Sequence, residues 1–236
     1  MATGDLALLG LLQLADGGFP SGAYVLSHGL ETLIADGAVR GGEDLGAALQ
    51  VSLLERHARA DLPVLLAAHD IGAAWPGEEA STEALIDLDR RLTTVKLARE
   101  EREGSARVGR RLALEAGRVL DSAMLMAMSE AIEAGKTPGN AAVVQGLAMA
   151  AVGVGRREAG LAAASSFAIA FVTAAVRLGR IGHGEAQRLI HTAGPDIARA
   201  VDIAEGVDPT DLGPSAPQLD IAAARHERAA VRTFAS

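Results

Sequence analysis

Glycine and proline divide this chain into segments of helical length, and no segment alternates apolar and polar residues as a β-strand would. The clearest breaks lie at residues 16–22 and 75–77, where adjacent Gly or Pro residues end helical geometry. Only 3% of the residues are aromatic although 49% are hydrophobic, so the core must be built mostly from Ala, Leu and Val. Side chains of this size favour closely packed helices, and the sequence therefore predicts an all-α fold.

We expect one globular bundle of about ten helices. Asp61 is a suitable N-cap, and Pro63 fits the first turn of the helix that follows it. Gly104 and Gly109 predict either a break or a tight crossing in the charged segment 81–116. The other expected helices cover residues 5–14, 24–35, 43–58, 119–134, 141–152, 158–178, 184–192 and 195–205.

The last thirty residues differ in character from the rest. Three X-Pro pairs between residues 208 and 217 prevent a long helix there, and helical composition returns only at residues 219–231. We therefore divide the chain into a helical domain, residues 1–205, and a flexible C-terminal tail, residues 206–236. A short helix on such a tether is expected to bury little against its own domain, so it either frays or docks on a partner and folds as it binds.

Composition excludes several classes of function. A formal net charge of −8 opposes broad binding to nucleic acid or to anionic membranes. The absence of cysteine excludes disulfides, Cys-ligated metals and thiol nucleophiles. The apolar run at the N-terminus follows no basic region, so we expect a cytoplasmic protein. The uncharged stretches 137–155 and 159–176 are rich in small residues, which indicates buried helices rather than membrane spans.

Motifs for catalysis are not recognisable. The sequence has no phosphate-binding loop, no dinucleotide fingerprint, no His-Glu-x-x-His and no Gly-x-Ser-x-Gly, so we expect no catalytic, cofactor-binding or metal-binding residue. His57 and Asp61, four residues apart, leave a nickel or zinc site open as an alternative, although such a pair is more often a cap or solvated. Arginines could instead reach the nucleotide phosphates of a partner, and the candidates are Arg99, Arg102, Arg110, Arg111, Arg156 and Arg157.

Four blocks of the sequence resemble the urease accessory protein UreF family. The first block is Leu-Gln-Leu-Ala at residues 12–15 with Pro-Ser-Gly-Ala-Tyr-Val-Leu-Ser-His-Gly-Leu-Glu at 20–31, and the last is Pro-Gln-Leu-Asp-Ile-Ala-Ala-Ala-Arg-His-Glu at 217–227 with Arg-Thr-Phe-Ala-Ser at 232–236. Two weaker blocks comprise Arg99-Glu100 with Ser105 and residues 109–112, and residues 140–146. The chain departs from the family pattern at Leu26, Asn140, Ala141, Ala223 and Ala224.

The resemblance implies a non-enzymatic scaffold and chaperone for nickel insertion. Members of the family are all-helical, dimerise, bind the accessory protein UreD (UreH in some systems), and through it recruit and regulate the GTPase UreG. The assembly delivers nickel to apo-urease. The alternatives are a GTPase activator that acts through Arg99 or Arg110, a metal enzyme built on His57 and Asp61, and an unrelated helical adaptor.

The blocks also imply which residues contact partners. In the tail we expect Leu219, Ile221 and Phe234 to be the apolar anchors. Charged hydrogen bonds would fix the register. The full set of expected partner-binding residues is Tyr24, Ser27, His28, Glu31, Arg99, Glu100, Leu219, Asp220, Ile221, Arg225, His226, Glu227 and Phe234. The expected turn residues are Pro20, Gly22 and Gly29.

Overall fold

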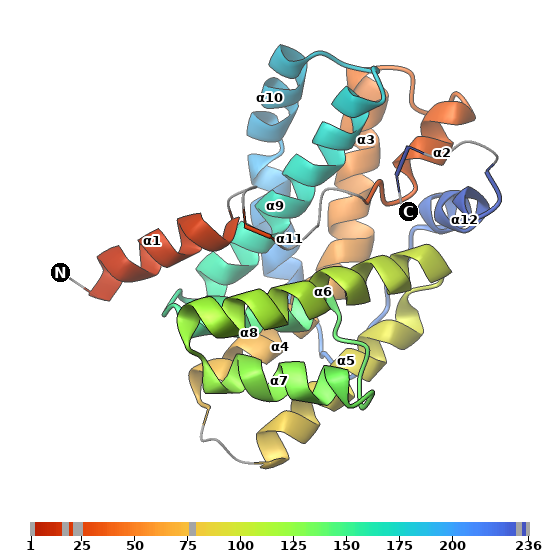
Figure 1. Ribbon diagram of the computed structural model, residues 1–236. Coiled ribbons are helices and arrows are strands. Elements are labelled where there is room, and N and C mark those ends of the chain that lie inside the picture. Colours follow the sequence, from red (N-terminus) through yellow and green to blue (C-terminus); the bar gives the residue numbers. More distant parts are fainter. Residues whose placement is uncertain (1–2, 16–18, 21–25, 76–78, 230–232, 235–236) are drawn as a thin grey trace.

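The computed structural model describes residues 3–15, 19–20, 26–75, 79–229 and 233–234, and the regular elements in this part of the chain are all helices, which confirms the predicted all-α fold. It contains twelve α-helices, a π-helix and a 3₁₀ turn and has no strand (Figure 1). The elements are α1 (Thr3–Ala15), α2 (Leu30–Ala35), α3 (Gly42–Val51), η2 (Ser52–Arg56), η3 (His57–Arg59), α4 (Asp61–Ala73), α5 (Glu79–Val95), α6 (Arg99–Leu120), α7 (Ala123–Glu133), α8 (Ala141–Ala151), α9 (Arg156–Arg177), α10 (His183–Thr192), α11 (Gly194–Glu205) and α12 (Pro217–His226).

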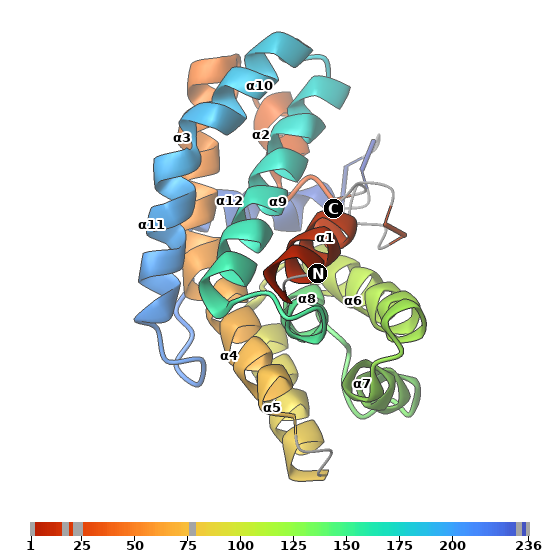
Figure 2. The same cartoon turned by 90° about the vertical axis from the view of Figure 1, so that its left-hand side faces the viewer.

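The helices form two groups that meet at α4. In one group α3, α9, α10 and α11 stand side by side, and in the other α4, α5, α6, α7 and α8 lie across them (Figures 1 and 2). Helix α4 packs against α8 and α9 and is buried on nearly every face, with Leu62, Val64, Leu65 and Leu66 at most 1% exposed. Helix α1 projects from the body, and its main contacts with the body are with α8 and α9. The core is thus built from aliphatic side chains at the junction of the two groups.

Helix α9 is long and apolar enough to cross a membrane, by length and composition alone. Half of its most apolar window is buried in the fold, where α9 packs against α11, α4 and α10. Alanine and glycine line the buried face, which allows neighbouring backbones to approach closely. These features are those of a core helix, in agreement with the expectation for residues 159–176.

The charged segment forms two continuous helices, α5 and α6. Of the two alternatives at Gly109, the tight crossing is the one the structure shows, because a Cβ atom at this position would lie 2.1 Å from the carbonyl oxygen of Gly139. The expected helix start at Val119 is wrong. Helix α6 continues through Leu120 and ends where Asp121 adopts a left-handed backbone, with φ 47°.

The expected helix over residues 24–35 is wrong at residues 26–29. Residues 26–29 are not helical, and α2 begins at Leu30, after His28 (φ 53°) and Gly29 (φ 84°) in left-handed conformations. A Cβ at position 29 would lie 3.0 Å from the carbonyl oxygen of Leu219, so the C-terminal helix approaches this turn closely. Tyr24 and Gly22 lie outside the described residues.

Candidate functional site

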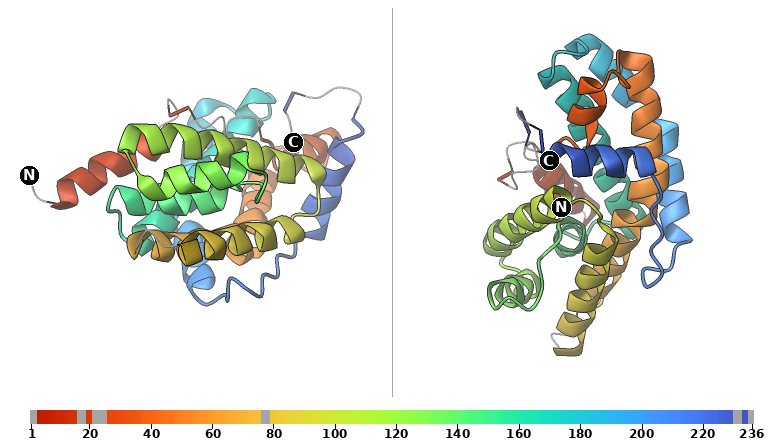
Figure 3. Two further views of the ribbon diagram at one scale, coloured as in Figure 1. Left: turned by 60° about the horizontal axis from the view of Figure 1, so that its bottom comes forward. Right: turned by 90° about the vertical axis from the view of Figure 1, so that its right-hand side faces the viewer.

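Segments far apart in the sequence meet around α12. This helix packs against α2 and against α6, beside the N-terminal end of α6 (Figure 3). Leu219, Ala222, Ala223 and His226 are buried in these contacts. The expectation that the tail helix buries little against its own domain is therefore wrong. The reason is that the Pro-rich segment runs back along the body, where Ser215 N donates a hydrogen bond to the Glu55 carbonyl oxygen at 2.9 Å. This path places α12 against α2.

His226 lies between two carboxylates. Its side chain is 1% exposed, with Nδ1 at 2.6 Å from Glu100 Oε2 and Nε2 at 2.9 Å from Glu31 Oε2. Glu31 also accepts hydrogen bonds from the backbone N–H groups of Thr233 (2.7 Å) and Phe234 (3.1 Å). We call these five residues the C-terminal clasp. Each ring nitrogen of His226 thus lies within hydrogen-bonding distance of a carboxylate oxygen.

The clasp keeps Glu31 ionised. Burial opposes its charge, but hydrogen bonds from Thr233, His226 and Phe234 outweigh burial and hold the pKa of Glu31 below its ordinary value. A carboxylate whose pKa is lower in the folded state stabilises the fold above its ordinary pKa. That contribution is lost as the pH falls through the lowered pKa.

Two further charged contacts fasten the same segment. Glu227 Oε1 accepts a hydrogen bond from the backbone N–H of Arg99 at 3.0 Å, and Glu227 Oε2 lies 3.4 Å from Arg99 Nε. A carboxylate at the first residue of α6 satisfies a free N–H group and favours the helix dipole. Arg225 pairs with Asp36 at the exposed end of α2. Five of the residues expected to bind a partner thus bind one another: Glu31, Arg99, Glu100, His226 and Glu227.

The apolar tail residues have different environments. Leu219 is 3% exposed and Phe234 is 6% exposed, with the Arg177 guanidinium carbon 4.5 Å from the Phe234 ring centroid. Ile221 is 59% exposed. Of the three expected anchors, only Ile221 is available to another molecule while the tail is docked. Nearer the N-terminus, Ser27 is fully buried and Pro20 is exposed.

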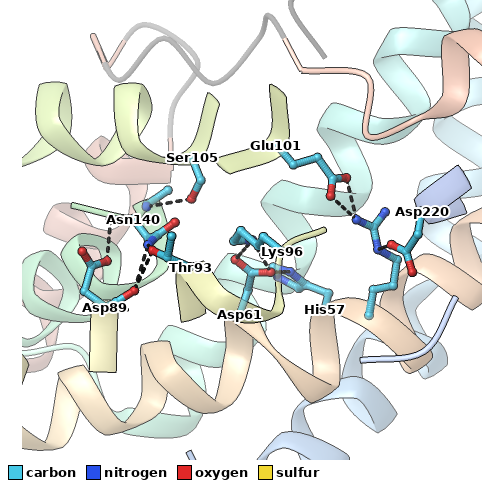
Figure 4. Close-up of polar contacts among 11 residues, drawn as sticks. His57, Asp61, Asp89, Thr93, Lys96, Glu101, Ser105, Asn140 and Asp220 are labelled. Atoms are coloured by element: carbon cyan, nitrogen blue, oxygen red, sulfur yellow. Dashed lines mark hydrogen bonds and ion pairs between the residues drawn. The ribbon is translucent and has the colours of Figure 1, made fainter. Parts of the chain in front are cut away.

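Arg56 joins α12 to the body through a buried chain of charges. It lies at the end of the π-helix η2, a conformation that occurs frequently at functional sites. Its guanidinium binds Glu101 of α6 and lies 3.3 Å from Asp220 of α12 (Figure 4). Burial, aided by the nearby charge of Glu101, raises the pKa of Asp220 against the attraction of Arg56. Sequence reasoning missed Arg56 and Glu101, because nothing in their spacing marks them.

A cavity of about 160 Å³ lies behind this chain of charges. Its polar walls include Arg56, Glu101 and a second buried pair, in which Lys96 Nζ lies 2.7 Å from Asp61 Oδ1. The His57 ring stacks on Phe167 with centroids 4.6 Å apart. Other lining residues are His28, Leu26, Leu65, Val108 and Gln145.

The alternative metal site does not assemble. His57 Nδ1 is 3.9 Å from Asp61 Oδ2, but the Asp61 carboxylate is bound to Lys96 (Figure 4). Within the described residues, no group of three His, Cys, Asp or Glu residues is arranged to hold a metal ion. The expected cap is also wrong, because Asp61 lies inside α4 and Ala60 occupies the N-cap position.

The two cavity histidines make stability depend on pH. Burial lowers the pKa of His28 and of His57 to about 4. Between pH 6.5 and 4 the unfolded chain takes up protons that the folded chain does not, so the free energy of unfolding falls as the pH falls, by up to about 3 kcal/mol for each histidine. Urea titrations at a series of pH values measure this slope. His57→Phe, which keeps the ring contact with Phe167, should flatten it, and an unchanged stability between pH 7 and 4.5 would contradict the assignment.

A separate polar network holds the loop before α8. The buried carboxylate of Asp89 accepts hydrogen bonds from the backbone N–H groups of Gly139 (2.7 Å) and Asn140 (2.6 Å). The Asn140 side chain donates to Thr93 Oγ1 at 2.7 Å, and Ala141 N donates to Ser105 Oγ at 3.1 Å (Figure 4). Asn140, one of the departures from the family pattern, is therefore part of the support for the crossing at Gly109.

Comparison with known proteins bears out the resemblance found in the sequence. The family model described as UreF matches residues 39–194. The urease accessory protein UreF of Yersinia enterocolitica is 31% identical over 229 residues, which cover 97% of this chain and 98% of that protein. The protein of the same name from Yersinia pseudotuberculosis is 30% identical over the same shares of both chains. The similarity to these relatives thus extends over nearly the whole chain.

Proposed function

The chain belongs to the UreF family of urease accessory proteins, and from this premise we propose that it is a non-enzymatic scaffold for the insertion of nickel into apo-urease. In this proposal it binds UreD (UreH in some systems), recruits the GTPase UreG and regulates it. The observation that carries the proposal is the docked C-terminal segment. Charged contacts with α2 and α6 hold α12 in a fixed position, as a recognition surface requires.

The partner-binding residues divide into two roles under this proposal. Glu31, Glu100, His226 and Glu227 position the tail, since their side chains are engaged within the chain. Ile221 is the outward anchor. UreD is then expected to contact the exposed face of α12 while the helix stays docked on the body.

The remaining finer assignments are part of the same proposal. We place the protein in the cytoplasm, with a helical domain of residues 1–205 and a partner-binding segment of 206–236. We also propose a homodimer. Support for the dimer comes from α1, a projecting helix whose outer face leaves four leucines more than half exposed, as surfaces of contact with other proteins often do. They are Leu6, Leu8, Leu9 and Leu12.

Capture of UreD by surface variants tests the proposal. Ile221→Asp should weaken capture of purified UreD at least about tenfold, because a charge replaces an apolar anchor while the clasp stays intact. Ile169→Asp on α9 is the matched control, since Ile169 is also partly exposed, at 44%. Capture by biolayer interferometry, with thermal unfolding to verify folding, measures both variants.

Two results would contradict the proposal at different levels. Equal capture by Ile221→Asp and Ile169→Asp would remove Ile221 from the interface. Failure of the wild-type chain to capture UreD, together with normal nickel content of urease in cells lacking the chain, would remove the scaffold function itself.

A further inference from the structure

The outward side of α6 carries four arginines in one stripe. Positions 107, 111 and 118 are separated by four and seven residues, so they share one face of the helix, and position 110 lies beside them. All four side chains belong to exposed residues. We call Arg107, Arg110, Arg111 and Arg118 the arginine stripe. It extends over about 16 Å along the helix axis.

Most of the stripe has no side-chain partner among the residues that the structure describes. Arg111 lies 3.1 Å from Glu115. In that part of the chain, no hydrogen bond or ion pair joins the side chain of Arg107, Arg110 or Arg118 to another residue. Some arginines on other exposed helices are paired, as Arg157 is with Asp202. The stripe is thus a local positive surface on a chain whose net charge is −8.

The opposite face of α6 holds the stripe rigidly. Val108, Leu112, Ala113 and Ala116 are buried on that face, and α6 packs against α8 and α7. Gly109 brings the helix backbone directly against the loop before α8. Side chains on a fixed helix lose less conformational freedom on binding than side chains on a loop. The stripe is therefore a preformed surface.

Apolar side chains adjoin the C-terminal end of the stripe. Val119 in the last turn of α6 is 57% exposed, and Met126 in α7 is 42% exposed. Arginine and methionine beside exposed apolar groups are a composition typical of protein interfaces. Glu103 and Glu115 on the same helix interrupt the positive surface, which suits the localised charges of a protein face better than the continuous charge of a phosphate backbone.

We propose that the arginine stripe is a docking surface for an acidic face of one of the proteins that this scaffold assembles. Guanidinium groups bind carboxylates through two parallel hydrogen bonds, which provides orientation as well as attraction. The inference rests on the proposed function for the existence of a protein partner. It adds a second contact surface, on a different helix from the C-terminal segment.

The test compares two triple charge reversals. The stripe variant is Arg107→Glu/Arg110→Glu/Arg118→Glu. The control is Arg180→Glu/Arg188→Glu/Arg199→Glu, which reverses three other exposed arginines and changes the net charge equally. Binding to purified UreD, UreG and apo-urease, and to a DNA duplex, is measured at several salt concentrations. Circular dichroism and thermal unfolding verify that both variants fold, and a triple Arg→Gln stripe variant removes the charge more gently.

We expect the stripe variant to lose at least about tenfold in affinity for one protein partner and the control to stay within about twofold. The salt dependence of binding to that partner should also become weaker in the stripe variant, with the Arg→Gln variant intermediate. An equal loss of affinity in both charge-reversal variants, or no loss in either, would overturn the inference. The proposed scaffold function would still stand in that case, because the wild-type chain binds its partners. Stripe-dependent binding to DNA alone would overturn the protein assignment. A wild-type chain that binds none of the three proteins would remove both the inference and the proposed function.

Discussion

Replacing His226 with alanine should release the C-terminal segment from the body. The substitution removes the imidazole that lies between Glu31 and Glu100, and His226 is 1% exposed in the docked state. Removing one partner from a buried ionic contact costs about 3–5 kcal/mol. The other anchors of the tail are the buried Leu219 and Phe234 and the charged contacts of Asp220 and Glu227, and we expect the loss at His226 to outweigh them.

Hydrogen exchange measures this release directly. Amide protection over residues 217–229 should fall in His226→Ala, while protection of α4 and α8 should stay unchanged. Capture of UreD should fall in parallel, because α12 is no longer held in position. Arg225→Ala is the control, since its exposed pair with Asp36 contributes at most about 1 kcal/mol. Retained protection over the tail in His226→Ala would show that the clasp does not hold it.

Replacing Arg56 with alanine should lower the free energy of unfolding by about 3–5 kcal/mol. Arg56 is the cation between Glu101 and Asp220, and its side chain is 17% exposed. Without Arg56, the Glu101 carboxylate, which is 6% exposed, has no guanidinium partner. It also lies near a second carboxylate, that of Asp220. Arg59→Ala provides the comparison, because its pair with Glu55 is exposed and is expected to contribute at most about 1 kcal/mol.

A double variant separates the charge from the packing. Arg56→Met/Glu101→Gln replaces both ends of the pair with uncharged groups of similar size, so it should be less destabilised than Arg56→Ala. Urea titration at neutral pH measures all of these variants. If Arg56→Ala and Arg59→Ala lose the same stability, the buried chain of charges contributes no more than a surface pair.

Most helices of the body could be predicted from the sequence. The expected segments 141–152, 158–178 and 195–205 match α8, α9 and α11 within two residues at each end. Helix starts and stops are local properties, set by Gly, Pro and the spacing of apolar residues. The predictions were wrong where tertiary contact prevailed, as at residues 26–29, which turn to admit the close approach of α12.

The sequence by itself determined the all-α class, the small-residue core and the family. Composition, the positions of helix-ending Gly and Pro residues, and motifs are all properties of the chain alone. Only the tertiary structure decided that His226 faces Glu31, 195 residues away, and Glu100, 126 residues away. It alone decided that Arg56, one of 22 basic residues, lies between the carboxylates of Glu101 and Asp220. The physical reason is that the energy of a charge depends on burial and on its neighbours in space, and neither is encoded in local spacing.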